Sequence, residues 1–359
     1  MNNHKLAHIG ISSNIRAACA SKLSYISTIM VRAKHFVYKK HFDGFPKDGD
    51  LVLEEEELPA IKDGEFLAEA VYLSVDPYMR KYAPWQPLNK TFYGRQIAVI
   101  KDSKNSKFPK GQHVLASFGW RSHTISDGVS KDPFPIKILP DYGGLPLSLG
   151  LGVLGHTGHT AYIGFLEISQ PKVGETVVVS GAAGAVGSIV GQIAKIKGCK
   201  VIGIAGSDKK GKWLTEELKF DRFINYKTQD VKTTLQEFAP EGVDYYFDNV
   251  GGEISSTVIY QLNPHGRVSA CGSISEYNDG GQKVTPIYFP LVAKELKIEG
   301  FQSRSWYHRW DEAVAQNLKW IQEGKLKYNE TVTEGFENMF VAFTDMLRGG
   351  NIGKAIVKA

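Results

Sequence analysis

The chain has 359 residues, of which 42% are hydrophobic and 23% are charged, and its formal net charge is +5. A chain of this length can bury a large core, and we expect two units of ordinary domain size. The 43 basic and 38 acidic residues are dispersed along the chain, which argues against a nucleic-acid partner. No run of 18 apolar residues is present, so no membrane span is expected.

Residues 1–29 differ in composition from the rest of the chain. They include Lys5, Arg16 and Lys22, whereas the first acidic residue is Asp43. This composition resembles a mitochondrial presequence, but it equally fits an extension upstream of a start at Met30. We expect a cytoplasmic protein with residues 1–29 outside the catalytic fold. A mitochondrial location is the alternative if they are a presequence.

The region from residue 31 to about residue 144 shows short β segments separated by proline and glycine. Strands are expected at 51–53, 65–74, 96–101 and 113–119. This pattern predicts a compact β-rich domain. The strand-like run at 353–358 needs a sheet to join, and we expect it to return to this first domain.

Residues 177–187 form an apolar strand followed by Gly181, Gly184 and Gly187. The first glycine permits a tight turn, the second lets backbone approach a diphosphate, and the third allows a helix to pack closely on the strand. Such a triplet also occurs for packing alone. The surroundings favour a dinucleotide site, because an amphipathic helix at 188–197, a left-handed stop at Gly198 and a buried strand at 200–205 complete a βαβ unit.

Further alternating segments follow this unit. Helices are expected at 208–219 and 228–238, and strands at 222–225, 243–247 and 266–271. Alternation of this kind predicts an α/β fold with a doubly wound parallel sheet.

The end of the second strand bears on the choice of dinucleotide. NAD sites usually have an acidic residue there, whereas this chain reads Ala-Gly-Ser-Asp-Lys-Lys over residues 205–210. A small residue, a hydroxyl and the ammonium groups of Lys209 and Lys210 suit a 2′-phosphate, so NADP(H) is the expected cofactor. Asp208 argues the other way unless it begins the next helix, and either lysine alone is also compatible with a solvated helix face.

The three cysteines, Cys19, Cys199 and Cys271, form no Cys-x-x-Cys pair. This indicates a reducing compartment and no thiolate metal site. We interpret Cys271, at a predicted strand end, as a small buried side chain and not as a reactive thiol.

Eight ordered strings extend these expectations. They are YLSVDPYMR (72–80), ASFGW (116–120), GAAGAVGS (181–188), IGIAGSDKK (202–210), FDNVGG (247–252), CGSISEYN (271–278), EGFENM (334–339) and GKAIVKA (353–359). From Met30 to Ala359 the chain resembles the medium-chain dehydrogenase/reductase superfamily, and within it the zinc-independent enone and alkenal reductases. The resemblance implies a GroES-like catalytic domain at 30–145 and 325–359, a Rossmann NADP-binding domain at 146–324, and an extension at 1–29.

The resemblance also implies a set of site residues. Those for the cofactor are Gly184, Ala185, Val186 and Gly187 at the diphosphate, Lys210 and Tyr226 at the 2′-phosphate, Asn249, the segment Cys271, Gly272, Ser273, Ile274, Ser275, Glu276 and Tyr277 beside the nicotinamide, Phe301, Gln302 and Ser303 in a second segment there, and Asn351 from the tail. Asn249 and Asn351 are equally typical turn residues. Tyr277 is the expected catalytic residue, with a surface-loop tyrosine as the alternative.

No metal is expected in the site. Asp76 stands where zinc-dependent relatives have a cysteine, and Gly94-Arg95-Gln96 stands where they have Gly-His-Glu. His156 and His159 are three residues apart, but the sequence has no cysteine or third ligand beside them. We expect these histidines to line the cleft between domains or to cap the helix that follows.

The implied activity is NADPH-dependent reduction of the carbon–carbon double bond of α,β-unsaturated ketones and aldehydes. Candidate substrates are 15-oxoprostaglandins and 2-alkenals, with oxidation of leukotriene B4 as a side activity. Tyr277 is expected to donate a hydrogen bond to the substrate oxygen as it becomes an enolate, since a phenol of pKa about 10 is protonated at neutral pH. The alternatives are a quinone reductase and a non-enzymatic NADPH-binding protein, structural or RNA-associated.

Two departures from the family pattern concern the substrate. Gly155-His156-Thr157-Gly158 replaces Gly-Met-Pro-Gly, and Gln302-Ser303 replaces commonly apolar residues. Both make the cleft more polar, so a long eicosanoid and a shorter, more hydrophilic alkenal stay open as substrates. The chain is expected to be a monomer or a homodimer, in the latter case paired through an edge strand near 296–301.

Overall fold

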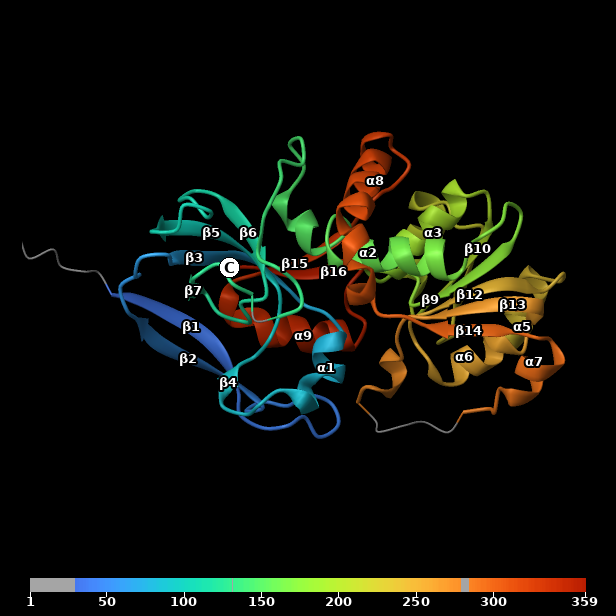
Figure 1. The fold of residues 1–359 in the computed structure, drawn as a ribbon. Helices are drawn as coiled ribbons and strands as arrows, with labels where there is room; N and C mark the ends of the chain where they lie inside the picture. Colours follow the sequence, from blue (N-terminus) through green and yellow to red (C-terminus); the bar gives the residue numbers. More distant parts are fainter. Residues whose placement is uncertain (1–29, 131, 279–283) are drawn as a thin grey trace, which may run out of the picture.

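The computed structural model describes residues 30–130, 132–278 and 284–359. The interpretations of residues 1–29 therefore concern residues outside this range. Figure 1 shows a β-rich region built from β1 to β8 beside a second region built from β9 to β14, with the C-terminal strand β16 in the first. Among the described helices, none is long and apolar enough to cross a membrane.

The β-rich region contains two sheets. In the smaller one, β1 (Val31–Tyr38) lies between β2 (Leu51–Leu58) and β4 (Lys90–Thr91). The larger has the order β15-β16-β3-β5-β6-β8, with β7 paired to β3. Its strands are β3 (Phe66–Ser74), β5 (Gln96–Ser103), β6 (His113–Ala116), β7 (His123–Ser126), β8 (Lys137–Ile138), β15 (Glu330–Glu334) and β16 (Lys354–Lys358).

The strand β2 is longer than the predicted 51–53, because four consecutive glutamates continue it. Glutamate has low strand propensity, but β1 pairs with β2 over its whole length and places basic side chains opposite the acidic run. Lys39 Nζ lies 2.6 Å from Glu54 Oε1, and Arg121 pairs with Glu56. Tertiary pairing therefore decides the end of this strand.

The C-terminal strand β16 joins the first region, as the sequence predicts. It runs parallel to β15 and antiparallel to β3, with Ile356 opposite Ser74. The helix α9 (Met339–Leu347) precedes it and contributes Phe343 to an aromatic core that includes Phe92 and Trp120. The tail is thus part of the core of the β-rich region.

The second region contains a parallel six-stranded sheet of order β11-β10-β9-β12-β13-β14. This is the dinucleotide-binding order, with the first strand β9 central. The strands are β9 (Thr176–Ser180), β10 (Lys200–Ala205), β11 (Arg222–Asn225), β12 (Val243–Asp248), β13 (Leu262–Ala270) and β14 (Lys297–Gly300). β14 lies at the sheet edge, and a homodimer paired through it stays a prediction.

Helices cover both faces of this sheet (Figure 1). Along β9 the side chains alternate, so that Val177 and Val179 belong to one core cluster and Val178 to another. The first cluster includes residues of α2 (His156–Ile163), α3 (Gly187–Ile196) and α8 (Trp310–Gln322). The second includes residues of α5 (Val231–Phe238) and α6 (Gly252–Ile259), with Leu291 of α7 (Tyr288–Ala293) packed against it.

Side-chain caps set two helix starts. The helix α5 begins three residues later than predicted, because Asp230 Oδ1 accepts a hydrogen bond of 2.8 Å from the backbone N–H of Thr233. Ser207 caps α4 (Asp208–Lys212), which continues through residues 213–217 as a wider helical turn. Asp208 is therefore the first residue of its helix, as one reading of the sequence proposes.

A close contact between α3 and the segment before β11 gives a stability prediction. A Cβ on Gly191 would lie 1.9 Å from Cζ of Phe220, whose ring is buried. We expect Gly191→Ala to destabilise the protein by about 1–3 kcal/mol, since overpacking outweighs the better helix propensity of alanine. Thermal unfolding followed by circular dichroism measures this, with Gly300→Ala as the control because its Cβ would have no neighbour within 4 Å. Equal midpoints for the two variants would contradict the packing argument.

Candidate active site

A cavity of about 590 Å³ lies where the carboxyl ends of the central parallel strands meet the β-rich region. We call it the interdomain cavity. Its wall consists of the glycine turn and the start of α3, the ends of β10, β12 and β13, the segment before α1 (Tyr78–Lys81), the start of α2, and the tail before β16. Ligands of parallel α/β sheets bind at this edge, so the cavity is the candidate site.

The glycine turn forms one wall of this cavity. Gly181 has φ of +57°, and a Cβ on Gly187 would lie 2.5 Å from the carbonyl oxygen of Gly181. The helix α3 can therefore cross the end of β9 only because Gly187 has no side chain. No side chain caps the start of α3, and all four predicted diphosphate residues, Gly184 to Gly187, line the cavity.

Lys210 and Tyr226 lie at the β10 end of the cavity. Lys210 Nζ donates a hydrogen bond of 2.7 Å to the carbonyl oxygen of Gly349, and burial followed by repulsion from Lys227 lowers the Lys210 pKa. The Tyr226 ring packs beside Gly206, where a Cβ would lie 2.9 Å from its hydroxyl oxygen. An ammonium group held in this way suits an anionic ligand.

Asp208 does not line the cavity. Its Oδ1 instead accepts a hydrogen bond of 2.7 Å from Asn225 Nδ2. The carboxylate that argued for NAD is therefore directed into the protein at the start of α4. Lys209 is exposed and also lies outside the cavity wall, so only one of the two lysines is at the site.

Tyr277 lies in the cavity wall after β13. The backbone N–H of Ser273 donates a hydrogen bond of 3.3 Å to its hydroxyl oxygen, which leaves the hydroxyl proton for another acceptor. Burial raises the pKa of Tyr277, and the Ser273 N–H opposes that rise. The phenol is therefore protonated at neutral pH and equipped to donate.

The helix α1 contacts the Tyr277 segment from the β-rich region, a feature that the sequence did not reveal. Arg80 Nε donates 3.0 Å to Asn278 Oδ1, and Lys81 Nζ lies 5.6 Å from the centre of the Tyr277 ring. Next to them, Gln302 Nε2 donates 3.2 Å to the Tyr82 hydroxyl. Residues remote in sequence thus hold the candidate catalytic tyrosine between the two regions.

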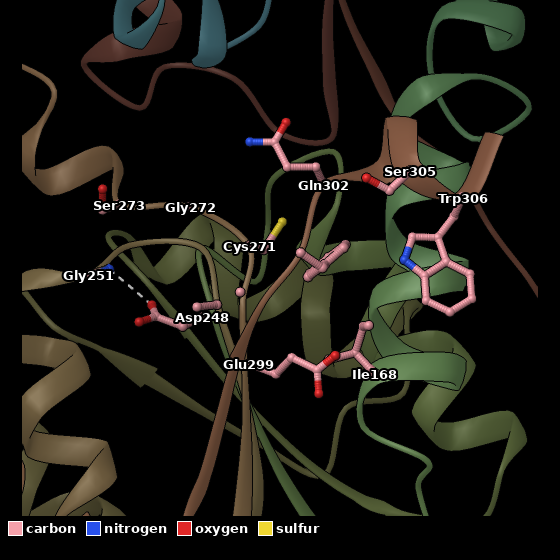
Figure 2. A pocket seen from close by; sticks show the side chains of 13 residues that line it. Ile168, Asp248, Gly251, Cys271, Gly272, Ser273, Glu299, Gln302, Ser305 and Trp306 are labelled. Carbon is pink, nitrogen blue, oxygen red and sulfur yellow. Dashed lines mark hydrogen bonds between the residues drawn. The ribbon is translucent and has the colours of Figure 1, made fainter.

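A second cavity of about 660 Å³ lies beside β14 and shares Gly251, Cys271 and Gly272 with the interdomain cavity. We call it the β14 cavity. In Figure 2, Cys271, Gly272 and Ser273 form one side, while Gln302, Ser305 and Trp306 form another. Burial raises the pKa of the Cys271 thiol to about 12, in agreement with an unreactive side chain.

The predicted cofactor residues are consequently divided. Phe301 and Gln302 line the β14 cavity and not the interdomain cavity. Of the segment after β13, Cys271, Gly272, Ile274, Ser275 and Tyr277 line the interdomain cavity, whereas Ser273 faces the β14 cavity. Glu276 and Ser303 line neither cavity.

Asn249 and Asn351 line the interdomain cavity and also stabilise local backbone. Asn249 Nδ2 donates 2.7 Å to the carbonyl oxygen of Ser180, which joins the ends of β9 and β12. Asn351 Nδ2 donates 2.8 Å to the carbonyl oxygen of Gly353. Their turn role is observed, and their cofactor role stays a prediction.

A buried ion pair at the cavity wall was not anticipated. Lys354 Nζ lies 3.1 Å from Asp76 Oδ1 and donates 2.7 Å hydrogen bonds to the carbonyl oxygens of Val75 and Ala355. Ser74 also donates to Asp76. The pair joins the terminal strand to the segment before α1, and a sequence reading finds it only once β16 is placed beside β3.

The two histidines occupy different surroundings. His156 lines the interdomain cavity, while His159 is fully buried and its Nε2 donates 3.2 Å to the carbonyl oxygen of Trp306. Capping of α2 was a wrong alternative, because the N-cap residue is Gly155 and no side chain caps it. In the described part of the chain, no group of three or more His, Cys, Asp or Glu side chains is arranged to hold a metal ion.

Two family descriptions match parts of the chain. Residues 34–133 match "N-terminal domain of oxidoreductase", and residues 185–320 match "Zinc-binding dehydrogenase". These ranges correspond to the β-rich region and to most of the parallel sheet. They agree with the α/β fold class and its accompanying β-rich domain.

Individual proteins match over nearly the whole chain. Prostaglandin reductase 1 of Bos taurus is 51% identical over 339 residues, which cover 92% of this chain and 100% of that protein. NADPH-dependent curcumin reductase of Escherichia coli is 34% identical, covering 91% and 97%. The crystal structure of CurA in complex with NADPH from Vibrio vulnificus has a TM-score of 0.85 at 36% identity, covering 91% and 99%.

His156 gives a pH prediction. Burial, with a smaller contribution from Arg95, lowers its pKa from 6.5 to about 4, although Asp76 opposes the shift and His159 and Lys354 add to it. Because the unfolded chain binds a proton that the folded chain excludes, stability is present above pH 6.5 and is lost as the pH falls toward 4. For His156 alone, the loss between pH 7 and pH 5 is about 2 kcal/mol.

Urea denaturation at the two pH values tests this, with His156→Gln beside the unaltered protein. The variant is expected to lose less stability between pH 7 and pH 5, by roughly the amount that one histidine contributes. Identical losses for both proteins would show that His156 does not titrate as described.

Proposed function

The chain belongs to the family of NADP-dependent oxidoreductases that includes prostaglandin reductase 1, and on that premise we propose that it reduces the carbon–carbon double bond of α,β-unsaturated ketones and aldehydes. One observation carries the proposal. The protonated phenol of Tyr277 and the glycine turn of Gly184 to Gly187 line the same cavity. A hydrogen-bond donor and a dinucleotide cradle are thus combined in one site.

The cofactor of this family is NADP(H), and the residues of the interdomain cavity fit it. The glycine turn has room for a diphosphate that a Cβ on Gly184 would narrow, and its wall has no side-chain cap that competes for the N–H groups. Lys210 supplies a positive charge where the sequence predicts the 2′-phosphate. When bound, NADPH supplies the hydride for the reduction.

The chain's own contribution is to position and polarise the substrate. Tyr277 is proposed to donate its hydroxyl proton in a hydrogen bond to the carbonyl oxygen of the enone. The Ser273 N–H engages the phenol oxygen and so orients the hydroxyl, while α1 holds the segment through Arg80 and Lys81. As negative charge builds on the substrate oxygen, that hydrogen bond strengthens, which lowers the barrier to hydride addition at the β-carbon.

The proposed substrates are 2-alkenals and oxo-eicosanoids such as 15-oxoprostaglandins, with oxidation of leukotriene B4 as a side activity. The relatives named above are a prostaglandin reductase and a curcumin reductase. The interdomain cavity, at about 590 Å³, is within the range of small-molecule sites.

Steady-state oxidation of NADPH tests the activity with a panel of 15-oxoprostaglandin E2, 4-hydroxynonenal, a short enone and a quinone. We expect turnover of the enones and the enal, with little quinone-dependent oxidation. Turnover of the quinone alone would favour a quinone reductase, and cofactor binding without any turnover would favour a non-enzymatic role. Tyr277→Phe is expected to lower kcat for the preferred enone by about 10²-fold or more, since it removes the donor.

The matched control for that variant is Tyr260→Phe. Tyr260 is outside both cavities and donates its hydroxyl to the carbonyl oxygen of Pro286. Its replacement is expected to leave kcat unchanged. Near-full enone activity in Tyr277→Phe would remove Tyr277 from the mechanism.

Lys210→Ala tests the choice of cofactor. Loss of a charge-assisted contact to the 2′-phosphate is expected to raise KM for NADPH by about tenfold or more and to leave KM for NADH nearly unchanged. Lys209→Ala is the control, because this exposed neighbour lies outside the cavity wall. Equal losses for the two cofactors would contradict the phosphate assignment.

A further inference from the structure

Arg95, which precedes β5, is a buried cation without a conventional partner. It is 7% exposed, and its Nε and Nη1 atoms are fully buried with no hydrogen bond. Within the described residues, no ion pair or hydrogen bond to its guanidinium is formed. Burial of an unpaired charge is strongly unfavourable, so such an arginine calls for a compensating ligand.

Aromatic rings provide only part of that compensation. The Arg95 Cζ atom lies 4.9 Å from the centre of the Phe134 ring and 5.3 Å from that of Trp310. Such cation–π contacts contribute about 2 kcal/mol when desolvated. They leave the guanidinium N–H groups without acceptors.

Other unpartnered polar atoms gather around the same ring. His156 Nδ1, Thr157 Oγ1 and the Tyr307 hydroxyl are buried without hydrogen-bond partners among the described residues. The Phe134 ring centre lies 5.6 Å from that of His156 and 5.5 Å from that of Tyr307. We call Arg95, Phe134, His156, Thr157 and Tyr307 the Arg95 cluster.

The charge of Arg95 is not balanced locally. Asp76 acts on it electrostatically but is already paired with Lys354 at 3.1 Å. Asp132 also acts on it, yet this side chain is exposed and forms no ion pair with it. His156 is neutral at pH 7, because burial lowers its pKa to about 4. The cluster therefore holds one uncompensated positive charge beside neutral hydrogen-bonding groups.

The cluster adjoins the proposed substrate site. His156 and Thr157 line the interdomain cavity, as does Tyr78, whose ring centre is 6.0 Å from that of His156. The glycine turn and Tyr277 line the same cavity. A ligand whose carbonyl lies at Tyr277 can therefore place another part of itself at the start of α2.

We propose that the Arg95 cluster is a subsite for a carboxylate carried by the substrate, so that the enzyme prefers enones and enals with an acidic end. This inference rests on the proposed reductase function and specifies its substrate class. A single negative charge matches the single uncompensated guanidinium, and a carboxylate also accepts hydrogen bonds from the neighbouring hydroxyls. The polar residues His156 and Thr157 then have a role at the end of the cavity that receives this group.

Two matched substrates test the proposal, namely 10-oxodec-8-enoic acid and its methyl ester, with saturating NADPH. For the unaltered enzyme, kcat/KM is expected to be about tenfold or more higher for the acid, mainly through KM, since a charge-assisted contact is worth at least that factor. In Arg95→Gln the ratio between acid and ester is expected to fall to about one. Arg32→Gln is the control, because the Arg32 side chain is 71% exposed and lies outside the cavity wall, and its ratio should match that of the unaltered enzyme.

The outcomes separate the two proposals. Reduction of neither compound would overturn the proposed function, whereas equal kcat/KM for acid and ester would overturn the subsite alone. An unchanged ratio in Arg95→Gln would also overturn the subsite. If that variant does not fold, octanoate and octan-1-ol are compared as inhibitors of ester reduction by the unaltered enzyme. Octanoate should inhibit at about tenfold lower concentration, and equal inhibition would overturn the subsite.

Discussion

The close crossing of α3 over the end of β9 is the contact on which the candidate site depends. With Gly187 lacking a side chain, the helix start comes within the reach of the Gly181 carbonyl, where a Cβ would be 2.5 Å away. The turn between them then presents backbone, and not side chains, to the cavity. The tail is attached to this same turn, since the Gly353 N–H donates 2.8 Å to the carbonyl oxygen of Ala183. The crossing thus sets both the dinucleotide cradle and its junction with the β-rich region.

The interdomain cavity differs in chemistry along its wall. Lys210 provides positive charge at the β10 end, Tyr277 provides a neutral donor after β13, and the Arg95 cluster lies behind His156 at the start of α2. The Asp76–Lys354 pair separates two of these environments and neutralises its own charges. One cavity can therefore be selective for a phosphate, a carbonyl and a carboxylate at different positions, provided that each assignment holds.

Local patterns predicted those elements whose neighbours impose little. The strand at 222–225 and the helix that starts at Asp208 agree with the structure, because burial periodicity and a serine cap decide them. The acidic half of β2 escaped prediction, since basic residues of other strands stabilise it. Histidine capping of α2 was wrong, because glycine occupies the cap position and the ring of His156 turns toward the cavity.

The sequence by itself determined the parallel α/β fold, the glycine cradle and the polar character of the substrate cleft, because spacing and residue type along one segment decide each of these. Only the tertiary structure decided which cavity each predicted residue lines, such as Phe301 beside β14 and Tyr277 between the regions. The same is true of the contact of Lys81 with Tyr277 and of the unpaired state of Arg95. These features join residues far apart in the chain, and their distances and burial follow from packing, which no local pattern records.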